Sequence, residues 1–340
     1  MNSFEHIKEE LRSHSLTWLI TGASGFIGSN LLEELLKLNQ KVIGLDNFST
    51  GSNLNLEKVQ ESVLEIQWKN FTFIEGDLCD LNLCKDACNN VDHILHQAAL
   101  GSVPRSIVNP IDSNRANVTG FLNILDTAMR KEIKSFTYAS SSSVYGDHPD
   151  LPKVESKTGN PLSPYALTKA INESFSSIFF GNYGYPSIGL RYFNVFGRRQ
   201  DPDGDYAAVM PRWISSMIAN KKIQIFGDGS SSRDFCFIDN VVQANIISAL
   251  SSQKAKNQVY NVAFGEKTAL IDLFKLIQQH LKVHGVEYSQ QPEYLEFREG
   301  DIKHSLADIS KAKSLLGYNP QYNIHEGISK TVEYYLKKEI

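Results

Sequence analysis

The sequence predicts an α/β protein with a doubly wound parallel sheet and a smaller, interleaved α/β domain. Up to Arg191, apolar segments of strand length alternate with segments of helix length, which implies a parallel sheet covered by helices on both faces. After Arg191, loops rich in Gly, Asp and Ser separate shorter elements. We therefore expect one domain to comprise residues 1–192 and 235–262, and the second to comprise residues 193–234 and 263–340.

The expected elements follow in chain order. The predicted strands are residues 16–21, 41–45, 71–75, 93–96, 135–139 and 187–191. Ile27, Leu31, Leu35 and Leu38 recur at helical spacing and predict a helix after the first strand. Further helices are expected at 114–129 and 164–183, and the charged first fifteen residues should form a short helix against the body.

Composition and charge exclude several classes of protein. The 340 residues are 41% hydrophobic and 21% charged, as in a globular protein. The net charge of −4 leaves no basic footprint for nucleic acid, and no apolar run approaches the length of a membrane span. The four cysteines match no zinc spacing and no disulfide set, so we expect no metal site and a cytoplasmic location. These residues are Cys79, Cys84, Cys88 and Cys236.

A glycine-rich turn follows the first predicted strand. Gly22, Gly25 and Gly28 stand between that strand and a helix, an order that lets backbone N–H groups and a helix N-terminus meet a pyrophosphate. Asp46 ends the next strand, where a carboxylate accepts hydrogen bonds from a ribose diol and repels a 2′-phosphate. The sequence therefore predicts a Rossmann-type arrangement that binds NAD rather than NADP.

Tyr165 and Lys169 form a candidate acid/base pair. Residues four apart share one face of a helix, so the ammonium lies one turn from the phenol. A phenol with a pKa of about 10 is a poor base, and a fixed positive charge favours its phenolate. A run of serines at 140–143 lies upstream and could orient a substrate alcohol.

Together these segments resemble the extended short-chain dehydrogenase/reductases that act on nucleotide sugars. The resemblance covers almost the whole chain, and within the family it is strongest to UDP-hexose 4-epimerases, in the branch of bacterial UDP-N-acetylglucosamine 4-epimerases. It rests on the glycine turn, Asp46 and Asn47, Gly76 to Leu78, His96 to Ala99, Asn117 and Val118, Tyr165 and Lys169, Arg191 to Gly197, Arg233 to Phe235, and Arg298 to Asp301.

The resemblance implies a set of NAD-binding positions. Asp77 and Leu78 would contact the adenine, and Lys169 would hydrogen-bond the nicotinamide ribose. Gln97, Ala98, Ala99 and Asn117 would line the nicotinamide side. The full set is Gly22, Gly25, Phe26, Ile27, Asp46, Asn47, Ser49, Thr50, Gly51, Asp77, Leu78, Gln97, Ala98, Ala99, Asn117, Tyr165, Lys169 and Tyr192.

The resemblance also implies catalytic and substrate-binding positions. Ser141, Tyr165 and Lys169 would be catalytic, with Ser141 and Tyr165 holding the sugar 4-hydroxyl. Asn194, Gln224, Phe226, Arg233, Arg298 and Asp301 align with UDP-binding positions. The full substrate set is Gly101, Ser102, Ser141, Ser142, Ser143, Asn194, Gln200, Ala208, Val209, Gln224, Phe226, Arg233, Arg298, Asp301 and Ser305.

Three departures from the UDP-galactose epimerase pattern point to a larger sugar. Ser305 stands where galactose-restricted enzymes carry tyrosine, Ala208 replaces an asparagine, and Gly101 with Ser102 replaces a lysine-containing stretch. We therefore expect epimerisation of UDP-N-acetylglucosamine to UDP-N-acetylgalactosamine, for surface polysaccharides such as O-antigen or capsule. Activity on UDP-Glc, UDP-Gal or uronic acid forms stays open.

Two alternatives remain at this point. One is another UDP-sugar enzyme of the same fold, such as a dehydratase, decarboxylase or uronate epimerase; the absence of an Asp-Glu pair at 143–144 argues against a dehydratase. The other is a non-catalytic NAD(H)-binding regulator. The resemblance further implies a homodimer joined by a four-helix bundle of helices 114–129 and 164–183. Their apolar side chains include Phe121, Leu122, Leu125, Phe175, Ile178 and Phe179.

Overall fold

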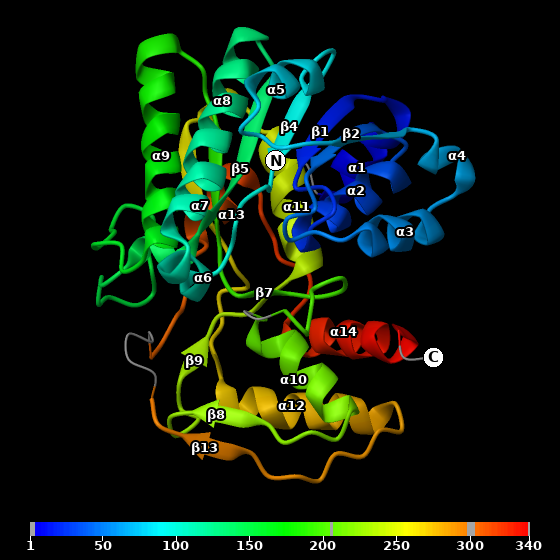
Figure 1. Cartoon of the computed structure of the whole chain (residues 1–340), viewed down its shortest axis with the longest axis vertical. Helices are drawn as coiled ribbons and strands as arrows, with labels where there is room; N and C mark the ends of the chain where they lie inside the picture. Colours follow the sequence, from blue (N-terminus) through cyan, green and yellow to red (C-terminus); the bar gives the residue numbers. More distant parts are fainter. Residues whose placement is uncertain (1–3, 205–206, 298–302, 339–340) are drawn as a thin grey trace.

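The computed structural model describes residues 4–204, 207–297 and 303–338, and it has the predicted α/β architecture (Figure 1). The larger body is built on a seven-stranded sheet in the order β11-β6-β5-β4-β1-β2-β3. Every neighbouring pair is parallel. The strands are β1 (Thr17–Thr21), β2 (Lys41–Asp46), β3 (Phe71–Glu75), β4 (His93–His96), β5 (Ser135–Ser141), β6 (Ile188–Tyr192) and β11 (Gln258–Val262).

Helices bury apolar side chains on both faces of this sheet. One layer contains α1 (Phe4–Ser13), α2 (Phe26–Lys37) and α11 (Ile238–Ala249), and the other contains α5 (Leu81–Ala87), α8 (Gly120–Arg130) and α9 (Pro164–Tyr183). Shorter elements complete the body. These are α3 (Asn53–Ser62), α4 (Glu65–Trp68), α6 (Val103–Val108), α7 (Pro110–Asn114), a π-helical turn (Arg115–Thr119), α13 (Ser310–Leu316), and two 3₁₀ turns (Ser142–Tyr145 and Gln253–Ala255).

Helix α9 has both of its ends specified by local sequence. The Ser163 side chain accepts a hydrogen bond from the Ala166 N–H, and Pro164 occupies the first turn, where its missing N–H costs nothing. Gly184 ends the helix at φ +69°, a left-handed conformation that glycine adopts without strain. Because the helix begins at a fixed residue, the positions of Tyr165 and Lys169 relative to the ends of the sheet strands are fixed as well.

A smaller part lies below the sheet in Figure 1. Its helices are α10 (Val209–Ile218), α12 (Leu270–Val283) and α14 (Ile324–Lys338). Three short strand pairs accompany them. They are β7 (Val195–Phe196) with β10 (Cys236–Phe237), β8 (Gln224–Phe226) with β13 (Glu293–Leu295), and β9 (Ser232–Arg233) with β12 (Thr268–Ala269).

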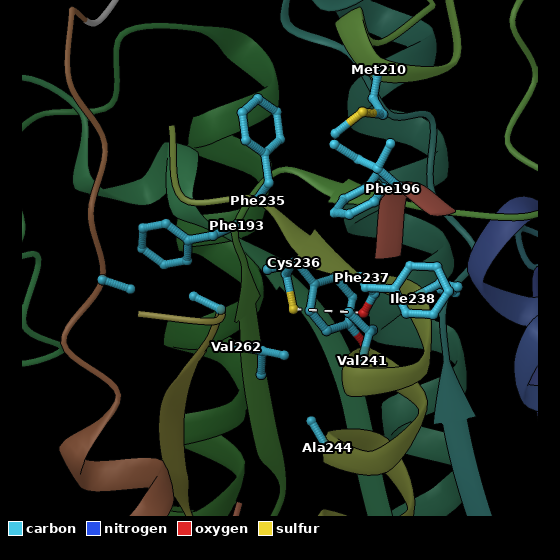
Figure 2. Close-up of a cluster of buried hydrophobic side chains, with 14 of the residues drawn as sticks. Phe193, Phe196, Met210, Phe235, Cys236, Phe237, Ile238, Val241, Ala244 and Val262 are labelled. Atoms are coloured by element: carbon cyan, nitrogen blue, oxygen red, sulfur yellow. Dashed lines mark hydrogen bonds between the residues drawn. The ribbon is translucent and has the colours of Figure 1, made fainter. Parts of the chain in front are cut away.

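One hydrophobic core runs from the sheet into the smaller part. Figure 2 shows Phe193, which follows β6, in one buried cluster with Phe235 and Phe237, and it shows Val262 at the end of β11. Met210 of α10 belongs to the same buried cluster. Because this core is continuous, the position of the loops after β6 is tied to the edge of the sheet.

Some elements differ from the sequence-based expectation. The expected helix 114–129 is interrupted, because residues Arg115–Thr119 form a π-helical turn between α7 and α8. Strand β11 was not among the six strands predicted from apolar runs. Helix α13 packs against β11 and α11, although its residues fall in the range 263–340. In the described part of the chain, no helix combines the length and the apolar character needed to cross a bilayer.

Candidate active site

A cavity of ≈ 620 Å³ opens at the carboxyl ends of the sheet strands. Residues at the ends of β1 to β6 line it, together with the loop between β6 and α10. Ligands of open α/β sheets bind at this edge. The predicted site residues found in its wall are Gly22, Gly25, Phe26, Ile27, Asp46, Asn47, Ser49, Thr50, Asp77, Leu78, Gln97, Ala98, Ala99, Gly101, Ser102, Tyr165, Lys169, Tyr192, Asn194, Gln200 and Ala208.

The glycine-rich turn requires its glycines for steric reasons. Gly22 has φ +72°, and a Cβ there would lie 2.8 Å from the Ala98 backbone nitrogen. A Cβ on Gly28 would lie only 2.0 Å from the Gly22 carbonyl oxygen. The turn can therefore close against α2 only without side chains, which leaves its backbone facing the cavity.

Asp46 holds its carboxylate at the end of β2 with two backbone contacts. Its Oδ2 accepts a hydrogen bond from the Ser24 N–H at 2.9 Å, and its Oδ1 accepts one from the Phe48 N–H at 2.8 Å. Both oxygens keep further acceptor capacity for a diol. Gly51 lies outside the wall and packs on the turn, since a Cβ there would meet the Ser24 hydroxyl at 2.0 Å.

Asn117 lies behind the cavity wall, in the π-helical turn. Its side chain binds both backbone groups of Leu100, accepting from the N–H at 2.7 Å and donating to the carbonyl at 3.1 Å. It also donates to the Thr168 hydroxyl of α9 at 3.2 Å. Asn117 therefore positions the loop after β4 relative to the helix that carries Tyr165.

Gln97 and Tyr192 are fixed by a residue that the sequence did not single out. The Tyr192 hydroxyl donates to Gln97 Oε1 at 3.0 Å, and Gln97 Nε2 donates to Asn245 Oδ1 at 2.9 Å. Asn245 Nδ2 in turn donates to the Tyr192 hydroxyl at 2.9 Å. This closed network on α11 fixes which atoms of Gln97 and Tyr192 face the cavity.

The candidate acid/base pair lies where α9 crosses the end of β5. The Lys169 ammonium donates to the Ala139 carbonyl at 2.8 Å, and it lies 6.0 Å from the centre of the Tyr165 ring. The Ser141 side chain is close enough to the Tyr165 hydroxyl to act on the pKa of that phenol. The three residues proposed as catalytic are thus brought together by one strand end and one helix.

Burial is the largest cause of the pKa shifts of both Tyr165 and Lys169. Burial raises the pKa of the Tyr165 phenol, and Ser141 opposes this only in part. Burial lowers the pKa of Lys169 to about 8, against the opposing effect of the Glu173 carboxylate. We expected Lys169 to lower the pKa of Tyr165; the shift is instead upward, because desolvation of the phenol dominates and the opposing effect comes from Ser141 rather than from Lys169.

The serine run contributes differently from the expectation. Ser141, Ser142 and Ser143 do not line the cavity, whereas Ser140 and Ala139 do. The Ser141 hydroxyl accepts hydrogen bonds from the Ser143 N–H at 3.1 Å and from the Ser143 hydroxyl at 2.9 Å. Ser143 therefore orients Ser141, which reaches the site through Tyr165.

Several predicted substrate residues lie in the smaller part and outside the cavity wall. Ser305 pairs by its N–H with the Ser232 carbonyl, and Arg233 donates to the Ser232 and Lys303 carbonyls. Gln224 on β8 donates to Glu293 of β13 at 3.2 Å. Val209 and Phe226 also lie outside the wall. Arg298 and Asp301 fall outside the residues that the structure describes.

Comparison with known proteins places this geometry in a family. Residues 18–263 match the model of the NAD dependent epimerase/dehydratase family. The chain belongs to this family. It is 34% identical to a UDP-glucose 4-epimerase of Mycolicibacterium smegmatis over 94% of this chain and 98% of that protein.

Two solved structures are similar to the whole epimerase-family chain. One is a UDP-N-acetylglucosamine 4-epimerase from Methanobrevibacter ruminantium in complex with UDP-N-acetylmuramic acid, with a TM-score of 0.86, 36% identity, and coverage of 95% of this chain and 99% of the other. The other is a UDP-glucuronic acid 4-epimerase from Bacillus cereus in complex with UDP-glucuronic acid and NAD. Its TM-score is 0.84 and its sequence identity is 30%, and the match covers 95% of this chain and 100% of the other.

The cavity of this epimerase-family protein fits its NAD cofactor. The turn that a Cβ on Gly28 would obstruct leaves backbone exposed for a pyrophosphate, and Asp46 stands at the distance along the chain expected for a ribose contact. Asp77 is also in the wall and forms a 3.4 Å ion pair with Arg115, which lies at the start of the π-helical turn. These features agree with the cofactor that the family uses.

The structure adds wall residues that the sequence-based list omitted. Gly28 and Gly76 belong to motifs that were recognised, so their spacing could have identified them. Arg105 of α6 and Asp201 of the loop after β7 bring charge to the wall, and no local pattern marks them. The full set of additions is Gly28, Leu45, Gly76, Leu100, Arg105, Ala116, Ala139, Ser140, Val195, Asp201, Gly204 and Ala207.

Proposed function

We propose that this protein is a UDP-sugar 4-epimerase, an isomerase that interconverts UDP-N-acetylglucosamine and UDP-N-acetylgalactosamine through a 4-keto intermediate. The observation that carries the proposal is the meeting of Tyr165, Lys169 and the end of β5 beside the glycine-rich turn. The named activities of the similar proteins support the reaction type and leave the sugar open among glucose, glucuronate and N-acetylglucosamine forms.

In the proposed reaction, Tyr165 removes the proton of the sugar 4-hydroxyl and later returns it. Ser141 is close enough to the Tyr165 hydroxyl to act on its pKa, while Lys169 supplies a nearby positive charge that favours the phenolate. NAD held by the glycine-rich turn and Asp46 would supply the acceptor and donor of the hydride at C4.

The UDP group would stay bound while the 4-keto sugar rotates and presents its other face. We assign this role to Asn194 in the cavity wall and to Gln224, Phe226, Arg233, Arg298 and Asp301. An arginine fork binds phosphate oxygens in two places at once. Holding the diphosphate uses remote binding energy to keep the intermediate in place between the two hydride steps.

Small residues in the wall support a preference for an N-acetylated sugar. Gly101, Ser102 and Ala208 line the cavity, and a Cβ on Gly101 would meet nothing within 4 Å. An acetamido group therefore finds open volume on this side. We propose that Ser305 adds to this volume when the substrate is bound.

A uronic acid form is the second candidate substrate, and Arg105 favours it. This cation belongs to the cavity wall near Ser102, at the end where the sugar would lie. A carboxylate at C6 would gain a charge-assisted hydrogen bond from a guanidinium there. The relatives that act on UDP-glucuronate agree with this candidate.

The proposal is tested by incubating the protein with UDP-GlcNAc, UDP-Glc and UDP-GlcNAcA in separate reactions and reading the products by NMR. We expect C4 epimers, with the fastest conversion for UDP-GlcNAc. Conversion of only the uronic acid would assign the second candidate. Bound NAD with no turnover on any sugar would replace the enzyme by an NAD(H)-binding regulator.

We also propose a homodimer joined by α8 and α9. Leu167 and Ile178 of α9 are half-exposed, and their spacing of about three turns places them on one face. Phe121, Leu125 and Phe179, which were considered for the same interface, are instead buried in the core of their own chain. Sedimentation at micromolar concentration tests this, and a monomer would refute it.

The domain division and the setting of the enzyme are further parts of the proposal. We propose that residues 1–192 and 235–262 bind NAD and that residues 193–234 and 263–340 bind the UDP-sugar, with α13 packed on the NAD-binding part. Nucleotide sugars for surface polysaccharides such as O-antigen or capsule are the proposed product, made in the cytoplasm.

A further inference from the structure

Three consecutive residues of β5 interact with three residues of α9 that are one helical turn apart. Ser141 acts on the pKa of the Tyr165 phenol, and the Ala139 carbonyl accepts a hydrogen bond from Lys169 at 2.8 Å. The Ser140 hydroxyl donates to Glu173 Oε1 at 2.6 Å. Since positions 165, 169 and 173 lie on one face of the helix, Glu173 extends the line of the acid/base pair by one turn.

Glu173 is also one half of a buried, bidentate ion pair. Arg191 of β6 donates to Glu173 Oε1 from Nε at 2.9 Å and to Oε2 from Nη2 at 2.7 Å. The two side chains are 4% and 15% exposed, with Arg191 the more buried. Arg191 donates in addition to the Glu155 carbonyl at 3.1 Å, and its guanidinium lies 4.8 Å from the centre of the Tyr145 ring.

The charges around Lys169 are few. Glu173 is the carboxylate whose effect opposes the desolvation of Lys169. His96 of β4 is neutral near pH 7, because burial first and then the charge of Lys169 lower its pKa to about 3. Other titratable groups lie on the sheet side of α9, and further charged groups lie on the helices that pack against it. The first set is Tyr165, Tyr138, Tyr145, Arg191, Tyr192, Glu155 and Lys311, and the second is Arg105 on α6, Asp112 on α7, Arg115 in the π-helical turn, and Asp126 and Arg130 on α8.

We infer that Glu173 is a positioning residue for the proton transfer: it fixes α9 to the ends of β5 and β6, and it supplies the counter-charge of the Lys169 ammonium. Glu173 does not line the cavity. It acts through Ser140, which does line the cavity, and through Lys169. Arg191 keeps the Glu173 carboxylate in place through two charge-assisted hydrogen bonds.

An electrostatic role of Glu173 predicts a pattern of pKa changes at Lys169 that a purely mechanical role would not produce. If Glu173 acts by charge, then removing it and removing Arg191 have opposite effects on Lys169. Without Glu173, the unpaired guanidinium repels the ammonium. Without Arg191, the carboxylate attracts it more strongly, whereas the loss of a purely mechanical tie would disturb α9 in the same way in both cases.

The test is an NMR titration of ¹³C-labelled lysine in the NAD-bound protein, with the Lys169 signal assigned by its absence in Lys169→Met. We expect Glu173→Gln to lower the Lys169 midpoint by roughly one pH unit and Arg191→Gln to raise it by a similar amount. The double variant should return close to the parent. The alkaline limb of kcat should move with the midpoint in each active variant.

Asp126→Asn is the matched control. Asp126 accepts from Arg130 at 2.7 Å in an exposed pair on α8, so its loss removes one carboxylate without changing the surroundings of Lys169. The inference is overturned if the midpoint stays unchanged in both single variants or moves in the same direction in both. If Glu173→Gln does not fold, the upward shift in Arg191→Gln decides the question alone.

This inference rests on the roles proposed for Tyr165 and Lys169, and the two can fail separately. The titration of Lys169 reports its charge whether or not the residue is catalytic. Normal epimerisation by Tyr165→Phe would sink the proposed roles while leaving the measured coupling between Glu173 and Lys169 in place.

Discussion

The two sides of the cavity are built in different ways. On the cofactor side, the wall is made of backbone and short side chains that directly follow buried strands, such as Gly22 after β1 and Asp46 at the end of β2. On the side proposed for the sugar, it is made by the loop after β6, which includes Gln200 and Ala208, and by α6. The positions proposed to bind UDP on β8 and β9 lie further out in the smaller part.

This difference explains why one side follows from local sequence and the other does not. The glycine turn is fixed by contacts within a few residues, so its spacing alone reports its shape. The sugar side depends on contacts between distant segments, for example Ser232 with Lys303 and Ser305. A substitution on the cofactor side should therefore change NAD binding alone. A substitution on the sugar side should change activity through the packing of the smaller part as well as through direct contact with the sugar.

The largest effect is expected where the two sides meet, at Tyr165. Replacing Tyr165 with Phe removes the acid/base oxygen and keeps the ring in its buried position. We expect kcat to fall by roughly a hundredfold to ten-thousandfold, as for a lost general base, with NAD still bound. Steady-state kinetics with UDP-GlcNAc and the absorbance of bound cofactor measure the two quantities. Near-normal turnover would remove Tyr165 from the mechanism.

Acid should break the network that joins the two sides. Glu33 of α2 accepts from Arg199 at 2.6 Å and from Arg198 at 3.3 Å, both in the loop that leads to Gln200. Burial alone would raise the pKa of Glu33, but these arginines and Lys37 lower it to about 2. Its stabilising contribution is complete above about pH 4.5 and should be lost, by about 3 kcal/mol in unfolding free energy, as the pH falls toward 2.

Urea unfolding at several pH values between 6 and 2 measures this loss. The Glu33→Gln variant is the comparison, because it keeps all the other carboxylates that titrate in the same range. It should be less stable than the parent at pH 6 and should lose less stability in acid. Parallel pH curves for the two proteins would contradict the assignment of the acid sensitivity to Glu33.

Adding a methyl group at Gly28 tests whether the glycine-rich turn requires glycine at this position. In Gly28→Ala the new Cβ would lie 2.0 Å from the Gly22 carbonyl, a contact with backbone that cannot rotate away. Overpacking of this kind costs about 1–3 kcal/mol, which predicts roughly tenfold to hundredfold weaker NAD binding in a calorimetric titration. Gly181→Ala is the control, since a Cβ there on α9 meets nothing within 4 Å. Equal NAD affinity in all three proteins would contradict the steric account.

Ser305→Tyr tests the sugar side and carries the smallest expected effect. A tyrosine ring reaching the sugar would clash with the acetamido group of UDP-GlcNAc and spare UDP-Glc, which has only a hydroxyl at C2. We expect a roughly tenfold selective loss in kcat/KM for UDP-GlcNAc. Because Ser305 lies outside the cavity wall, an equal loss for both substrates is the informative contrary result: it would mean that the segment 303–308 affects activity through packing.

The sequence predicted the fold class, the family and the NAD cofactor, and all three are confirmed. The six strands predicted from apolar runs are present within two residues at their ends, because each is a short run rich in apolar residues next to a turn. The initial charged segment forms α1, as expected. These features depend on periodicity and on short spacings, which a single sequence displays directly.

Other features were missed because they depend on contacts between distant residues. Nothing near Glu173 marks it as the partner of Arg191, eighteen positions away on another element. Arg105 and Asn245 likewise have no local pattern, and their roles appear only when α6 and α11 are placed. The upward pKa shift of Tyr165 is of the same kind, because the amount of desolvation at a residue follows from the whole packing around it.

The π-helical turn at Arg115–Thr119 has a consequence for the phase of the helices that flank it. One extra residue per turn rotates every following side chain by roughly 100° about the helix axis. Phe121, Ile124 and Leu125 of α8 point into the core with this offset included. A regular helix through all of these residues would swing that apolar stripe away from the sheet, whereas deleting a single residue from the turn would restore a regular helix and keep the stripe on the core. The rotational phase of α8 is thus set by the π-helical turn, which also contains Asn117.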